Sequence, residues 1–89
     1  MKVRKAHAFR FHNWGPRYRQ VQLVGSFDNW EERHAMAFDH YASQWFTTLH
    51  LPPGEHCYKY VIDGDTWVVN EEEPTTRDAQ LNVNNLASI

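Results

Sequence analysis

Two tryptophans in polar surroundings, Trp30 and Trp67, are the residues best placed to do chemistry. Trp30 follows the pair Asp28-Asn29, and Trp67 comes just after the turn-like segment 63–65. A flat indole can stack on the apolar C–H face of a sugar ring while nearby polar groups bind its hydroxyls. The same rings could instead plug the end of a β-sandwich, because tryptophan is highly buried on average. The residues alone leave both interpretations open.

Polar side chains near these tryptophans could supply the hydrogen bonds. Lys59 alternates with Tyr58 and Tyr60 and is expected to point outward, where a lysine is commonly just solvated. Asn82, Asn84 and Asn85 carry amides that both donate and accept, which suits pairs of hydroxyl groups. Asparagines in loops more often serve turn chemistry, so a binding role remains one of two options.

The elements that must position these residues are short β-strands. No segment keeps the helical spacing of apolar residues, whereas glycine and proline separate short alternating runs. Strands are expected at 8–12, 20–24, 44–51, 56–62 and 67–69, and residues 81–86 lead into a final short strand. The pattern predicts an all-β fold, a single-domain antiparallel sandwich of the immunoglobulin-like kind.

Alternation also predicts which side chains form the core. In 44–51 the residues expected to point inward are Trp45, Thr47, Leu49 and Leu51, with Phe46, Thr48 and His50 outward. In 56–62 the inward set is Tyr58, Tyr60 and Ile62, and the outward set is Cys57, Lys59 and Val61. Trp14 is expected to pack over a turn at 13–16, and Asp63-Gly64-Asp65 to form a hairpin turn.

Composition narrows the classes of partner. The chain has 89 residues and a formal net charge of −2, so it lacks the basic field that nucleic-acid binding needs. No apolar run approaches a membrane span, the first five residues lack the core of a secretory signal, and the single Cys57 fits a reducing compartment. We therefore expect an intracellular, cytoplasmic location, with a plastid as the alternative, and neither nucleic acid nor membrane as partner.

Three segments in order resemble a known family. They are Val21–Trp30 (VQLVGSFDNW), Leu51–Gly64 (LPPGEHCYKYVIDG) and Val83–Asn85 (VNN). Together they are similar to carbohydrate-binding module family 48, the glycogen-binding domain of AMP-activated protein kinase beta subunits and of starch-related glucan phosphatases. The resemblance spans nearly the whole chain and implies that residues 1–89 form one glycogen- or starch-binding module.

The resemblance also implies roles for individual residues. Trp30 and Trp67 would be the two stacking platforms, Lys59 would donate to sugar hydroxyls, and Leu81 would press into the ligand. Asn84 would bind a hydroxyl, and Asn82 would replace a threonine of the family pattern. The hairpin before Trp67 is one residue longer than in the kinase, and the segment after Leu81 is one shorter, which puts glucan-length preference in doubt.

These observations predict non-catalytic binding of α-1,4-linked glucan that targets a larger protein to the polysaccharide. The expected partners are α-glucan and other domains or subunits of a parent kinase, phosphatase or starch-metabolism protein. The alternative is an interaction domain of a kinase regulatory subunit with little sugar affinity.

Catalysis, cofactors and metals are not expected. The acids that could form a glycosidase pair all fall in loops or turns (Asp28, Asp63, Asp65 and Glu71 to Glu73). The spacings of the six histidines match no structural zinc pattern (His7, His12, His34, His40, His50 and His56).

Overall fold

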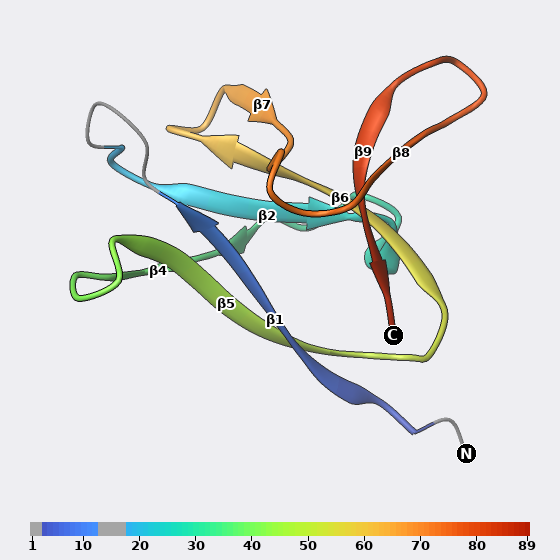
Figure 1. Cartoon of the computed structure of the whole chain (residues 1–89), viewed down its shortest axis with the longest axis horizontal. Coiled ribbons are helices and arrows are strands. Elements are labelled where there is room, and N and C mark those ends of the chain that lie inside the picture. Colours follow the sequence, from blue (N-terminus) through green and yellow to red (C-terminus); the bar gives the residue numbers. More distant parts are fainter. Residues whose placement is uncertain (1–2, 13–17) are drawn as a thin grey trace.

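The computed structural model describes residues 3–12 and 18–89 (Figure 1). The expected turn at 13–16, with Trp14, lies outside the described residues. Along the chain the elements are β1 (Lys5–His12), β2 (Val21–Gly25), the short 3-10 helix η1 (Ser26–Asp28), β3 (His34–Ala35), β4 (Ala37–Asp39), β5 (Gln44–Leu51), β6 (Glu55–Ile62), β7 (Thr66–Val68), β8 (Thr75–Arg77) and β9 (Val83–Ser88).

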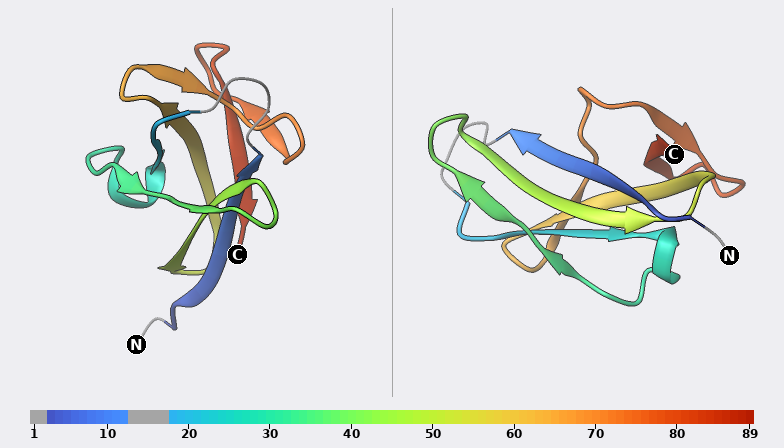
Figure 2. Two further views of the ribbon diagram at one scale, coloured as in Figure 1. Left: turned by 90° about the vertical axis from the view of Figure 1, so that its left-hand side faces the viewer. Right: turned by 90° about the horizontal axis from the view of Figure 1, so that it is seen from below.

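The strands form two antiparallel sheets. One has the order β1-β5-β4, and the other has the order β3-β2-β6-β9-β8, with β7 also paired to β6. Figure 2 shows the two layers from two further directions. No helix among the described residues is long and apolar enough to cross a membrane. The prediction of an all-β antiparallel sandwich is confirmed.

The two-residue period decides which side chains fill the space between the sheets. In β5, Trp45 and Leu51 are buried while Phe46 and His50 are exposed, as the alternation predicts. In β1, Phe9 is fully buried, and the strand begins three residues earlier than expected, pairing with the whole of β5 from Lys5 to His12. The strand assignments that rest on alternation therefore hold.

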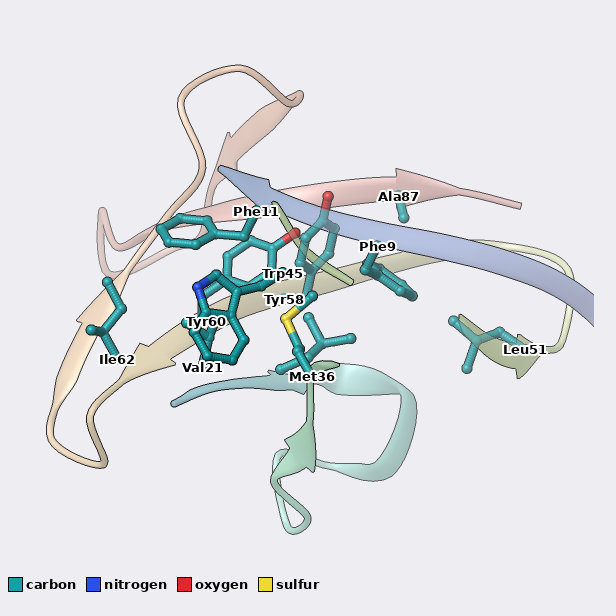
Figure 3. Packing of buried hydrophobic residues seen from close by; sticks show 11 residues of the cluster. Phe9, Phe11, Val21, Met36, Trp45, Leu51, Tyr58, Tyr60, Ile62 and Ala87 are labelled. Atoms are coloured by element: carbon teal, nitrogen blue, oxygen red, sulfur yellow. The ribbon is translucent and has the colours of Figure 1, made fainter. Parts of the chain in front are cut away.

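The core between the sheets is built largely from aromatic rings (Figure 3). Phe9 meets Tyr58 edge-on with the ring centroids 4.9 Å apart, and Phe11 lies 4.7 Å from Tyr60. Each ring buries a large apolar area, and tilted contacts of this kind add to that burial. This core provides a firm base for the second sheet, whose other face carries the candidate site.

One prediction on β6 is wrong. Val61 was expected to face outward into solvent, but it is fully buried, as is Val24 on β2. Val61 pairs with Gln22 of β2 on one side and with Trp67 of β7 on the other. The outer face of the second sheet is therefore shielded from solvent at this point, in the middle of the sheet between β2 and β7.

A buried polar network joins the two sheets beside β9. The Asn85 amide accepts from the Asn70 backbone N–H at 2.7 Å and donates to the Asn70 carbonyl at 2.8 Å. The Asn70 amide in turn donates to the Arg10 carbonyl of β1 and to Glu73 Oε1, both at 3.1 Å. The Tyr60 hydroxyl also donates to Glu73 Oε1, at 2.7 Å. Burial and the nearby Glu73 carboxylate raise the pKa of Tyr60 well above its usual range.

Candidate functional site

An open depression of about 310 Å³ lies on the outer face of the second sheet. The residues that line it are Trp30, Lys59, Trp67, Asp78, Asn82 and Asn84. Five of the six residues that the sequence predicts as binding residues therefore meet in one place. The sixth, Leu81, does not line the depression; it lies in the turn before β9 with 71% of its surface exposed.

Strand register brings Lys59 and Asn84 together. Lys59 of β6 lies opposite Val24 of β2, and Tyr58 lies opposite Asn85 of β9. Continuing the second ladder by one residue places Lys59 opposite Asn84, and residues that face each other across strands share a face. Within residues 3–12 and 18–89, neither the Lys59 ammonium nor the Asn84 amide has a hydrogen-bond or ion-pair partner. Both groups border the depression and are available to a ligand there, although Asn84 keeps only 7% of its surface exposed.

The same alternation places Asn85 away from the site. Neighbouring residues of a strand point to opposite faces, so Asn84 faces the depression while Asn85 is fully buried on the other side. The idea that the Asn85 amide serves a ligand is therefore wrong, since its hydrogen bonds go to the Asn70 backbone and to the Pro74 carbonyl.

A tight turn after β2 positions Trp30. The Trp30 backbone N–H donates to the Gly25 carbonyl at 2.8 Å, with Asn29 and Trp30 both in the left-handed region at φ 57° and 63°. Gly25 is required for space, because a Cβ there would lie 2.2 Å from the Phe27 ring. Trp30 is partly exposed. A left-handed conformation is unusual for so bulky a residue, and such conformations are often found at functional sites.

Trp67 lies on β7, just beyond the hairpin that the sequence predicts at 63–65. The turn uses positive φ at Asp63 and Gly64, and Asp63 Oδ1 accepts the backbone N–H groups of Arg19 and Gln20 at 2.7 and 3.1 Å. These bonds tie the hairpin to the chain entering β2. The Trp67 side chain has 47% of its surface exposed, so it is a surface ring and does not plug the core.

Asp78 is a lining residue that the sequence reasoning missed. Its Oδ1 accepts the backbone N–H groups of Gln80 and Asn82, both at 2.9 Å, and its Oδ2 accepts from the Asn82 amide at 3.3 Å. These contacts fold residues 78–82 into the turn that presents Asn82. An aspartate bonding the backbone two residues later is an Asx turn, and that pattern could have been recognised in the sequence.

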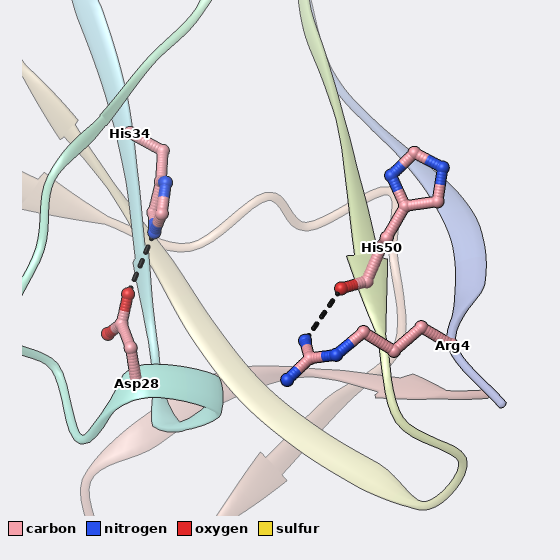
Figure 4. Close-up of polar contacts among 4 residues, drawn as sticks. All are labelled: Arg4, Asp28, His34 and His50. Atoms are coloured by element: carbon pink, nitrogen blue, oxygen red, sulfur yellow. Dashed lines mark hydrogen bonds and ion pairs between the residues drawn. The ribbon is translucent and has the colours of Figure 1, made fainter. Parts of the chain in front are cut away.

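The carboxylates considered for catalysis mostly have structural contacts. Asp63 holds the hairpin, Glu73 accepts from Tyr60, and Asp28 Oδ2 accepts from His34 Nε2 at 2.8 Å. The Asp28–His34 bond closes the loop that carries Trp30 (Figure 4). The other contact drawn there, from the Arg4 guanidinium to the His50 carbonyl, lies on the first sheet. Asp28, Glu32 and His34 have potential ligand atoms within 4.8 Å of one another. The expectation of no bound metal stays a prediction.

Comparison with known families decides the identity of the domain. Residues 8–89 match the sequence profile described as the glycogen recognition site of AMP-activated protein kinase. The chain belongs to this family. The glycogen-recognition match covers all nine strands except the first residues of β1, and it includes every lining residue of the depression.

Curated relatives of this glycogen-recognition domain include kinase subunits and a plant protein. The 5'-AMP-activated protein kinase subunit beta-2 of Homo sapiens is 33% identical over 76 residues, which is 85% of this chain and 27% of the subunit. Protein PTST, chloroplastic, of Arabidopsis thaliana is 32% identical over 83 residues, which is 91% of this chain and 28% of that protein. The chain thus spans about a quarter of the length of these relatives.

Proposed function

We propose that this domain binds α-1,4-linked glucan, such as glycogen or starch, in the depression on its second sheet and does not catalyse a reaction on it. Trp30 and Trp67 would stack on the sugar rings, while Lys59, Asn82 and Asn84 would bind hydroxyl groups. The observation that carries the proposal is that two partly exposed tryptophans line the same depression as a lysine and an amide that have no bonded partner among the described residues. Family membership supports the same ligand class.

The energetics fit a weak site that works on a polymer. Covering one face of an indole removes about 80–100 Å² from water, worth ~2 kcal/mol. Two platforms and a few hydrogen bonds of ~1 kcal/mol each give a gross gain of about 6–8 kcal/mol before ordering costs. A single site should therefore bind with a Kd in the high-micromolar to millimolar range. Repeated sites on the polysaccharide raise the effective concentration and make this affinity useful.

The wider role follows from the length of the relatives. Because the chain covers about a quarter of each, we place it as a targeting module within a larger kinase, phosphatase or starch-metabolism protein. Relatives named as kinase subunits and as a chloroplastic protein support a cytoplasmic location with the plastid as the alternative. In this role Leu81, exposed in the turn beside the depression, would contact the glucan as it extends beyond the site.

Isothermal titration with maltoheptaose tests the proposal. The wild-type domain should bind at millimolar ligand, and Trp67→Ala should lose at least tenfold in affinity. Phe46→Ala is the matched control, since Phe46 is similarly exposed, at 38% against 47% for Trp67, but lies on the opposite sheet. Failure of the wild type to bind refutes glucan binding and leaves a protein-interaction role to be sought. Equal losses in the two variants would refute the assigned face.

A further inference from the structure

Arg33 lies at the edge of the second sheet, on the same face as the depression. β3 pairs with β2 through Gln22 opposite Ala35 and Leu23 opposite His34. The next position along the ladder places Arg33 opposite Val24, which itself lies opposite Lys59. By this register the Arg33 side chain belongs to the outer face that carries Lys59 and Asn84. Neither the sequence motifs nor the family resemblance points to it.

The Arg33 guanidinium reaches across that face to the hairpin before β7. Its Nη1 donates to the Gly64 carbonyl at 2.9 Å, and its Cζ lies over the Trp67 ring, 5.6 Å from the ring centroid. Within the described part of the chain, Arg33 forms no ion pair with a carboxylate. A charged donor on a carbonyl and a cation over an indole are both favourable contacts. Arg33 therefore connects the loop of Trp30, three residues before it, to the hairpin of Trp67.

Arg33 contacts a residue of the depression without lining the depression itself. Trp67 lines the depression, but Arg33 does not. The indole contacts the guanidinium and also borders the depression, so the ring face turned away from Arg33 is the one that a sugar could cover. We propose that Arg33 is a positioning residue that fixes the Trp67 ring so that its free face is ready to receive a sugar; this inference rests on the proposed glucan binding.

Preorganisation is the physical reason that such a contact matters. A half-exposed indole on a three-residue strand can adopt several rotamers, and a ligand that needs one of them must pay for ordering the ring. Arginine suits the task better than lysine, because a planar guanidinium can lie over a ring and donate to a carbonyl at once. The ordering cost of one side chain corresponds to about a 2- to 10-fold change in affinity.

The test uses Arg33→Gln and Arg33→Lys, with Arg10→Gln as the control. Arg10 is also exposed, and its loss changes the net charge equally, but it lies on the first sheet. Indole N–H signals of the ¹⁵N-labelled domain are recorded without ligand, and the Trp67 signal is assigned by its loss in Trp67→Phe. Maltoheptaose affinity is then measured for each variant, with a melting curve to confirm folding.

We expect Arg33→Gln to shift the Trp67 indole signal and to weaken maltoheptaose binding by about 2- to 10-fold. Arg33→Lys should resemble Arg33→Gln in both readouts, whereas Arg10→Gln should resemble the wild type. An unchanged Trp67 signal and affinity in Arg33→Gln, in a wild type that binds glucan, overturns this inference alone. Full recovery with lysine overturns the role of the planar stack. A wild type that does not bind overturns the proposed function and this inference with it.

Discussion

Replacing Asn85 should lower the free energy of unfolding far more than the sequence suggests, where this residue resembles an ordinary loop asparagine. Its amide is fully buried and makes three hydrogen bonds to backbone groups, two to Asn70 at 2.7 and 2.8 Å and one to the Pro74 carbonyl at 3.2 Å. These bonds hold the chain after β7 against β9. Asn85→Ala removes all three and leaves the buried Asn70 N–H without its partner, whereas the Asn70 and Pro74 carbonyls still accept from the backbone N–H groups of Glu73 and Leu86.

The expected loss can be worked from these contacts. Three net hydrogen bonds at ~1 kcal/mol each, with an added penalty of ~1–3 kcal/mol for a backbone group that stays unpaired, give about 4–6 kcal/mol. A domain of this size has about 5–15 kcal/mol of stability in all. Asn85→Ala should therefore unfold at a much lower urea concentration, or fail to fold at physiological temperature.

Urea unfolding followed by circular dichroism measures this directly. Asn84→Ala is the matched control, because it removes the same amide from the next residue, which faces the depression and makes no hydrogen bond within the described residues. Asn84→Ala should cost about 1 kcal/mol or less and should weaken maltoheptaose binding. A loss below about 1 kcal/mol for Asn85→Ala, or equal losses for the two variants, would refute the reasoning.

Two other perturbations test the network and the site loop. Because burial and Glu73 raise the pKa of Tyr60, the unfolded chain releases this phenolic proton first. The contribution of Tyr60 to stability is then full below about pH 10 and falls above it by ~1.4 kcal/mol per pH unit. Tyr58, whose pKa is also raised by burial and by Glu73, adds to the slope. Tyr60→Phe should reduce that slope in urea unfolding from pH 9 to 11, and an unchanged slope would contradict the assignment. Asp78→Ala should weaken maltoheptaose binding severalfold with little change in melting temperature. Asp78→Asn, which keeps Oδ1, should bind maltoheptaose better than Asp78→Ala. The reverse order would exclude the role of Asp78 in holding the turn that presents Asn82.

The alternation of apolar and polar residues along the strands was enough to predict most of the fold. The inward sets of β5 and β6 follow from a two-residue period, because one face of each strand meets the opposite sheet. Val61 is buried although it lies on the outer face, since a two-residue period assigns a face but cannot say whether that face is covered. Its pairing with Trp67 depends on a short strand and a register that only tertiary structure fixes.

The site was predictable to the extent that its residues lie in recognisable motifs. Trp30, Lys59 and Trp67 were found because each closes or follows a distinctive segment. The contact between Arg33 and Trp67 joins positions 34 apart in the sequence, and the pairing of Asn70 with Asn85 spans fifteen residues. Nothing in the local sequence marks such pairs. A loop arginine or asparagine that bonds a distant residue has the same local sequence context as one that is only solvated.

The most direct test of the account is to map the glucan on the surface by NMR. Maltoheptaose is added at millimolar concentration to the ¹⁵N-labelled domain. We expect the indole signals of Trp30 and Trp67 and the backbone signals of Lys59 and Asn84 to shift, while the indole signal of the buried Trp45 stays in place. Shifts confined to the sheet of β1, β5 and β4, or no shifts at all, would contradict it.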